Sequence, residues 1–292
     1  MAQRYQRQHP QGQQLGADRR PDIGFVPTMG ALHRGHGALV ARCVSENAVT
    51  ILSIFVNPLQ FGANEDLDHY PRQLAADLEL CQQWGVTAVF VPNVDELTNG
   101  QQVQVMPPPA MTEVLCGRSR PGHFVGVATI VTKLLNIIQP DRAYFGQKDG
   151  QQVAIITQLV AQLNLPVVVV SVPTLREADG LALSSRNVYL TPSERRIAPN
   201  LYRGLQQVET AIHQGERQVN VLCDLFRHSL AIGLAIGNDS HTQFGIDYVA
   251  IVTADTLTPV SDHLTAGARI MVAVAAKLGK ARLIDNILVD VD

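Results

Sequence analysis

The chain has 292 residues, of which 46% are apolar and 17% charged, so it can bury a core in one large domain or two moderate ones. Its formal charge of −3 gives no general attraction to nucleic acid or to an acidic membrane surface. We therefore expect small molecules as partners, with no nucleic acid and no membrane.

The cysteines and the first residues indicate a cellular compartment. Four cysteines lie far apart, without the close pairing of a zinc site or a disulfide framework: Cys43, Cys81, Cys116 and Cys223. Residues 1–22 are rich in Gln, Arg and Gly and lack the apolar core of a signal peptide. No later run approaches the roughly 18 apolar residues of a membrane span. The sequence predicts a cytoplasmic protein whose residues 1–22 form a flexible leader.

From Ile23 onward, short β-rich runs alternate with longer amphipathic stretches. Strands are predicted at 23–26, 49–55, 87–91, 142–145 and 167–172, and helices near 36–47, 71–84, 126–138 and 149–163. The run of four valines at 167–170 lacks polar alternation, as a strand covered on both faces of a sheet requires. Residues 23–174 are therefore expected to form an α/β domain with a parallel sheet.

The pattern changes after about Leu175. A turn-rich bridge at 176–194 leads into helical segments near 193–213 and 217–233 and then into β-rich runs at 246–252, 270–276 and 282–289. This order predicts a smaller α+β domain at 175–292. Because ligand pockets often lie between domains, we expect a site that draws on both.

The most informative segment is VPTMGALHRGHGALV at 26–40, where a predicted strand is followed by a turn and then by a helix. His33 and His36 lie at the start of that helix, beside backbone N–H groups that favour an anion such as phosphate. Both imidazoles can donate hydrogen bonds to phosphate oxygens. Two alternatives stay open: ordinary surface or helix-capping histidines, and zinc binding, for which a third ligand close in sequence is missing.

The segment HRGH has the HxGH form of the nucleotidylyltransferase superfamily, and the longer PTMGALHRGH resembles the pantothenate synthetase (pantoate–β-alanine ligase) family. Four further blocks resemble that family in the same order, at 55–72, 120–152, 172–190 and 277–287. The resemblance implies a Rossmann-like domain with a smaller C-terminal lid domain, a homodimer, and ATP with Mg²⁺. It also implies ligation of pantoate to β-alanine through a pantoyl adenylate.

The resemblance implies roles for particular residues. The ATP site would consist of Met29, Gly30, Ala31, Leu32, His33, Arg34, Gly35, His36, Gly146, Gln147, Lys148, Asp149, Leu175, Leu183, Ser184, Ser185 and Arg186. The catalytic residues would be His36, His33, Lys148 and Arg186. Gln60, Gln152 and Asn57 would bind the substrates, and Asp77 would help to position magnesium or a nearby polar group.

The chemistry of these side chains suits that reaction. A carboxylate must approach the α-phosphate, so two anions are brought together, and the cations Lys148 and Arg186 can offset their repulsion. Gln60 and Gln152 can bind hydroxyl and carboxylate oxygens without adding another negative charge.

Three positions depart from the family pattern: Gln147 and Cys116 replace common glutamates, and Gly150 replaces a larger residue. The segment FGQKD resembles the ligase half of fused pantothenate synthetase and cytidylate kinase proteins, so the chain is open to being one domain of a longer protein. Two other functions stay open. One is a nucleotidylyltransferase with a phosphorylated acceptor, and the other is a non-catalytic nucleotide-binding protein.

Overall fold

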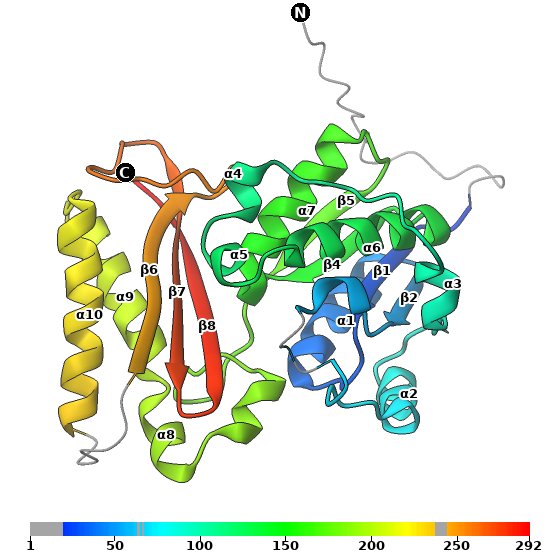
Figure 1. Ribbon diagram of the computed structural model, residues 1–292, viewed down its shortest axis with the longest axis horizontal. Helices are drawn as coiled ribbons and strands as arrows, with labels where there is room; N and C mark the ends of the chain where they lie inside the picture. The colour runs from blue at the N-terminus through cyan, green and yellow to red at the C-terminus, as the bar shows by residue number, and fades with distance from the viewer. Residues whose placement is uncertain (1–19, 63–64, 66, 237–243) are drawn as a thin grey trace, which may run out of the picture.

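The computed structural model describes residues 20–62, 65, 67–236 and 244–292 (Figure 1). The predicted flexibility of the leader falls on residues 1–19, which lie outside the described residues. Its last residues contact a later segment of the chain: Arg20 donates to the Asp141 carboxylate at 3.2 Å, and Asp22 lies 3.6 Å from Arg142. No helix in these ranges is long and apolar enough to cross a membrane.

The N-terminal half contains a five-stranded parallel sheet, as predicted, in the order β3-β2-β1-β4-β5. The strands are β1 (Ile23–Thr28), β2 (Val49–Ile54), β3 (Ala88–Phe90), β4 (Arg142–Gly146) and β5 (Val168–Val172). The main helices are α1 (Arg34–Glu46), α2 (Leu74–Gln83), α6 (His123–Ile138) and α7 (Gly150–Gln162). Phe25, Leu52 and Tyr144 are fully buried, as expected for strands covered on both faces.

Several short elements escaped the sequence analysis. They are the helices α3 (Val94–Thr98), α4 (Pro109–Thr112) and α5 (Cys116–Ser119) and the 3₁₀ turns η1 (Pro58–Gln60), η2 (Gln147–Asp149) and η3 (Ser185–Tyr189). None exceeds five residues, so none contains enough turns to show a 3.6-residue apolar period.

The C-terminal half contains the antiparallel sheet β6-β7-β8, formed by β6 (Phe244–Thr253), β7 (Arg269–Leu278) and β8 (Ala281–Asp290). The helices α9 (Asn200–His213) and α10 (Val219–Ile236) cover the side of this sheet that faces away from the N-terminal half (Figure 1). The segment predicted as helical at 193–213 is divided into α8 (Pro192–Ile197) and α9. Pro199, which has no backbone N–H to donate, lies at the break.

A buried apolar cluster joins the two halves. The cluster consists of Met111, Leu115, Phe124, Ala154 and Ile155 from the first half and of Val252, Leu257, Met271 and Ala273 from the second half. The cluster places β7 against α7. A Cβ atom at Gly150 would lie 2.6 Å from the Met271 sulfur, so this departure from the family pattern gives β7 room to approach.

Candidate active site

The site lies where the sheet order reverses. β1 and β4 are neighbours, and the chain leaves their carboxyl ends toward α1 and α7 respectively, which opens a crevice at that edge. A pocket of about 470 Å³ is found there. Its lining includes fifteen of the residues that the resemblance implied: Met29, His33, Gly35, His36, Asn57, Gln60, Gly146, Lys148, Asp149, Gln152, Leu175, Leu183, Ser184, Ser185 and Arg186.

Six of the implied residues stand outside this lining: Gly30, Ala31, Leu32, Arg34, Asp77 and Gln147. Gly30 to Leu32 form the turn that connects β1 to the histidine motif, and Arg34 is exposed at the start of α1. Gly30, Ala31 and Leu32 therefore connect β1 to the histidine motif without forming the pocket surface.

His33 and His36 cap α1 reciprocally. The Nδ1 atom of His33 accepts from Gly35 N–H at 3.0 Å, and the Nδ1 atom of His36 accepts from His33 N–H at 3.2 Å. The ring centroids are 4.2 Å apart. Because both Nδ1 atoms act as acceptors, each neutral ring carries its proton on Nε2. The helix-capping alternative is therefore realised, and each ring keeps an Nε2–H donor for a ligand.

Burial keeps both rings neutral. It lowers the pKa of His36 from 6.5 to about 3, and the neighbouring His33 and Lys148 add to this shift. The pKa of His33 is also lowered, first by burial and then by Lys148. At neutral pH the pair can donate hydrogen bonds but carries no charge.

Asp77 anchors the turn that leads into the histidine motif. Its carboxylate accepts from Ala31 N–H at 2.9 Å and from Leu32 N–H at 2.8 Å, and only 1% of the residue is exposed. Ala31 needs such support because it adopts a positive φ of 50°, which non-glycine residues rarely do. The magnesium role of Asp77 stays a prediction, and this geometry favours a structural role instead.

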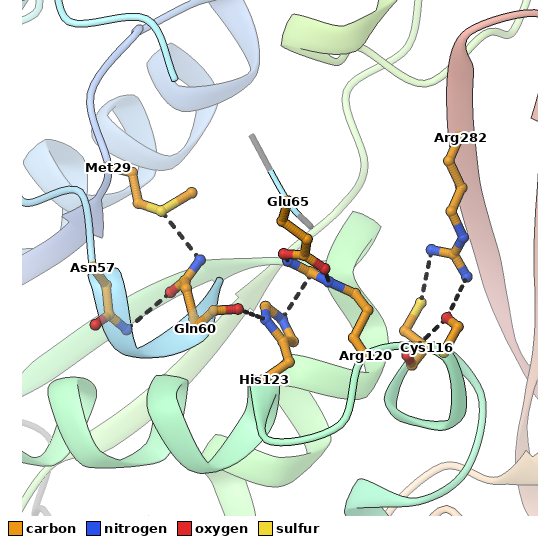
Figure 2. A network of polar contacts seen from close by, with 9 residues as sticks. Met29, Asn57, Gln60, Glu65, Cys116, Arg120, His123 and Arg282 are labelled. Atoms are coloured by element: carbon orange, nitrogen blue, oxygen red, sulfur yellow. Dashed lines mark hydrogen bonds and ion pairs between the residues drawn. The ribbon is translucent and has the colours of Figure 1, made fainter. Parts of the chain in front are cut away.

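Gln60 lies in a polar network at the end of η1 (Figure 2). Its amide oxygen accepts from Asn57 at 3.1 Å, and its amide nitrogen donates to the Met29 sulfur at 3.1 Å. The Asn57 amide also donates to the carbonyl of Gly126 in α6. The Gln60 amide is thus held in one orientation, with one N–H and one lone pair left for a ligand.

Arg120 and His123 lie in the block at 120–152 that resembles the family, and no role was predicted for either residue. In the structure, His123 Nδ1–H donates to the carbonyl of Gln60 at 2.8 Å, and Arg120 lies 3.1 Å from His123 Nε2. Arg120 also forms a two-pronged ion pair with Glu65, with both contacts at 2.6 Å (Figure 2). These three residues support η1 from the side of α6.

The cationic side chains of Lys148 and Arg186 reach the pocket from two further segments. Lys148 lies in η2 after β4, 3.9 Å from Asp149, the one carboxylate among the described residues that line the pocket. Residues 173–190, which follow β5 and are called the strap below, carry Arg186. Within the strap, Ser184 caps the 3₁₀ turn η3 by accepting from the Arg186 N–H at 3.2 Å. The excess of positive charge favours an anionic ligand such as a polyphosphate.

A second cavity of about 810 Å³ lies between the two sheets and shares Lys148, Gln152 and Arg186 with the first. Cys116 lies on its wall, with its thiol 3.1 Å from the Tyr248 hydroxyl. The same thiol lies 3.6 Å from Arg282 (Figure 2). Arg282 in turn binds Asp247 at 2.6 Å. The departure at Cys116 therefore lies in a contact between the two halves of the chain.

The segments that form this pocket match a known protein family. The family model described as Pantoate-beta-alanine ligase matches residues 3–288. The chain belongs to the pantoate-beta-alanine ligase family. This match covers all the segments that line the pocket.

Two solved structures resemble the whole chain. One is the pantoate-beta-alanine ligase (pantothenate synthetase) of Thermus thermophilus, which is 47% identical with a TM-score of 0.83 and covers 93% of this chain and 94% of its own. The other is the pantoate-beta-alanine ligase of Francisella tularensis, complexed with beta-gamma ATP and beta-alanine. It is 35% identical with a TM-score of 0.71 and covers 92% of this chain and 90% of its own.

A longer relative is also similar. The bifunctional pantoate ligase/cytidylate kinase of Trichormus variabilis is 52% identical over 271 residues. The match covers 90% of this chain and 49% of that protein, so the chain spans about half the length of this relative.

Proposed function

We propose that the chain condenses pantoate with β-alanine at the expense of ATP, through a pantoyl adenylate, and releases pantothenate, AMP and pyrophosphate. The observation that carries the proposal is that one pocket brings together the HxGH histidines, Lys148, the strap with Arg186, and Gln60. The Francisella tularensis ligase, with beta-gamma ATP and beta-alanine bound, supports ATP and β-alanine as substrates.

In the first step, a pantoate carboxylate oxygen attacks the α-phosphorus of ATP, and the bond to pyrophosphate breaks. Lys148 and Arg186 lower the repulsion between the two anions and hold the phosphates. The Nε2–H groups of His33 and His36 donate to oxygens on which negative charge grows. Since both rings are neutral, they stabilise this charge as hydrogen-bond donors without transferring a proton.

In the second step, the β-alanine amine attacks the acyl carbon of the adenylate, gives up a proton to solvent, and displaces AMP. Gln60 and Gln152 lie on the pocket wall, where neutral amides can hold a hydroxyl or carboxylate group in place for attack. Alignment of the two reactants is the contribution that these neutral amides can make, and the contacts with Asn57 and Met29 hold the Gln60 amide in place for it.

Magnesium, a homodimer and a cytoplasmic location belong to the same proposal. Among the described residues, no group of three or more His, Cys, Asp or Glu side chains could hold a metal ion. This fits Mg²⁺, which commonly binds substrate phosphates with one or two carboxylates. Asp149, as the carboxylate in the pocket lining, is the residue that could reach it.

The test is to measure AMP and pyrophosphate release with ATP, Mg²⁺ and pantoate, with and without β-alanine. Sustained AMP release that needs both substrates, together with pantothenate, would support the proposal. AMP or pyrophosphate release with a phosphorylated acceptor in place of pantoate would favour a nucleotidylyltransferase. ATP binding without turnover would favour a non-catalytic role.

A further inference from the structure

Two neighbouring residues of β8, Asp285 and Asn286, reach the two segments that carry the cations of the pocket. Both are polar and deeply buried, with 4% and 6% of their surface exposed. Buried polar groups are costly unless they are hydrogen-bonded, so the partners of these two side chains indicate what they do.

Asn286 binds the backbone of the turn that carries Lys148. Its Nδ2 group donates to the carbonyl of Gln147 at 2.8 Å and to the carbonyl of Lys148 at 3.0 Å. Its Oδ1 atom accepts from the Gln147 side chain at 2.9 Å. The Gln147 oxygen accepts from Ser171 at 2.7 Å, so every amide group in this chain of contacts has a partner.

Asp285 binds the base of the strap that carries Arg186. Its carboxylate accepts two hydrogen bonds from Arg176, at 2.6 and 2.9 Å. Arg176 pairs with Ala182 across the strap and also donates to the carbonyl of Gly180. Arg176 further lies 3.5 Å above the ring of Tyr202. The start of the Leu183–Arg186 segment is therefore tied to β8.

Two departures from the family pattern fit the same contacts. Gln147 supplies the N–H that Asn286 Oδ1 accepts, which a glutamate carboxylate lacks. At Gly150, a Cβ atom would lie 2.9 Å from Asn286 Oδ1, so glycine leaves room for the Asn286 amide.

We propose that Asp285 and Asn286 form a clamp that positions Lys148 and Arg186 against the phosphates of ATP. The clamp belongs to the second domain, whereas Lys148 follows β4 of the first, so ATP activation depends on the contact between domains. Both are positioning residues that act through other side chains. The inference rests on the proposed ligase activity and adds to it the residues that align its cations.

The main test compares Asn286→Ala with Asn136→Ala, whose exposed amide donates to the Thr132 carbonyl within α6. Pantoate-dependent exchange of pyrophosphate into ATP is measured for both. We expect Asn286→Ala to lose about 10²-fold in rate, the size of effect that a displacement near 1 Å produces, and Asn136→Ala to match the wild type. In a Lys148→Ala background, Asn286→Ala should cause little further loss. A full further loss there would overturn the inference.

A second variant covers the case in which Asn286→Ala folds poorly. Gln147 is partly exposed, so Gln147→Ala removes the side-chain partner of Asn286 with less risk to folding. It should weaken exchange in the same direction, and its effect should be less than additive with that of Asn286→Ala, because the two groups share one contact. Wild-type rates in Gln147→Ala and Asn286→Ala, with unchanged melting temperatures, would contradict the clamp.

The affinity for a non-hydrolysable ATP analogue is measured alongside. If the wild type shows no exchange activity, the proposed ligase activity is refuted. The comparison of ATP-analogue affinities between the variants then tests the clamp by itself. Weaker binding in Asn286→Ala than in Asn136→Ala would support the clamp, and equal binding would refute it.

Discussion

At the scale of single residues, each histidine of the HxGH motif uses one ring nitrogen to cap a helix and leaves the other free to bind a ligand. The Nδ1 edges cap α1, and the Nε2–H edges remain for the ligand. From the sequence alone, helix capping and catalysis are competing interpretations of these two histidines. The structure shows that a capping histidine keeps a donor with a fixed tautomer.

This division predicts different outcomes for two substitutions at His36. Asn places an acceptor near the position of Nδ1, so His36→Asn should keep the cap and its stability but lose about 10²-fold in adenylate formation, as expected for a lost charge-stabilising donor. His36→Gln carries an N–H farther out and should retain more activity with a lower melting temperature. Rates and thermal unfolding measured on both variants check this. Near-wild-type turnover of His36→Asn would remove His36 from its proposed role.

Burial of His36 also predicts a pH dependence of stability. The pKa of this residue falls from 6.5 in the unfolded chain to about 3 in the folded one. Between these values the unfolded state binds a proton that the folded state does not, so stability falls as the pH drops below about 6.5. Unfolding free energies of the wild type and His36→Asn, measured from pH 7 to 4.5, should diverge with a slope approaching one proton. Parallel curves would show that His36 titrates normally.

The residues that the family motifs single out meet in one place, whereas the residues that support them were not predicted. Fifteen implied residues line one pocket, and their roles toward a ligand stay a prediction. Asp77 was expected beside a metal, whereas its carboxylate binds the backbone of Ala31 and Leu32 from 45 or more residues away. No local pattern encodes such a contact, and the same holds for the support that Arg120 and His123 give to Gln60.

At the scale of elements, the parallel sheet could be predicted because apolar strands and amphipathic helices alternate with clear periods. The order β3-β2-β1-β4-β5 could not be read from periodicity, since it depends on which strands pair. That order brings the loops after β1 and β4 together. The short turn η1 likewise lacks a period, and its place is set by its close approach to α6.

The close packing of η1 against α6 predicts the effect of adding one methyl group at Gly126. A Cβ atom at Gly126 in α6 would lie 2.1 Å from the carbonyl oxygen of Leu59 and 2.7 Å from the nitrogen of Gln60. Gly126→Ala must therefore push η1 away and misplace the Gln60 amide. We expect a KM for pantoate raised about tenfold or more, together with a loss of stability of about 1–3 kcal/mol from overpacking.

The matched control is Gly245→Ala in β6, where the added Cβ atom would have its nearest neighbour at 3.6 Å, an ordinary contact. Steady-state kinetics with varied pantoate separate the two variants. An unchanged KM for pantoate in Gly126→Ala would show that the position of η1 does not govern substrate binding.

At the scale of the whole molecule, the second half of the chain is joined to the first by the buried cluster that both share, as well as by hydrogen bonds. Met271 of β7 is 1% exposed and packs in one cluster with Ala154 and Ile155 of α7. A lid attached only by a linker would lack such a core. The division at residues 174 and 175 stays a prediction, and the shared cluster indicates that the two halves depend on each other for stability.

Met271→Ala tests this dependence. Removing a buried Met side chain should cost about 2–5 kcal/mol. Because the cluster contains both halves, calorimetry of the wild type should show a single transition that the substitution shifts as a whole. The control, Met106→Ala, removes a side chain from a residue that is 75% exposed and should change little. Two separate transitions in the wild type, with one of them unmoved by Met271→Ala, would show that the halves unfold independently.

The four thiols of the chain differ in how deeply they are buried. Cys43, Cys81 and Cys223 are buried, and burial raises the pKa of each, so alkylating reagents should reach them slowly. Cys116 is partly exposed and lines the cavity between the two sheets. A maleimide dye added to the native protein should therefore attach mainly at Cys116, and its emission would report the approach of the two halves without any engineered cysteine.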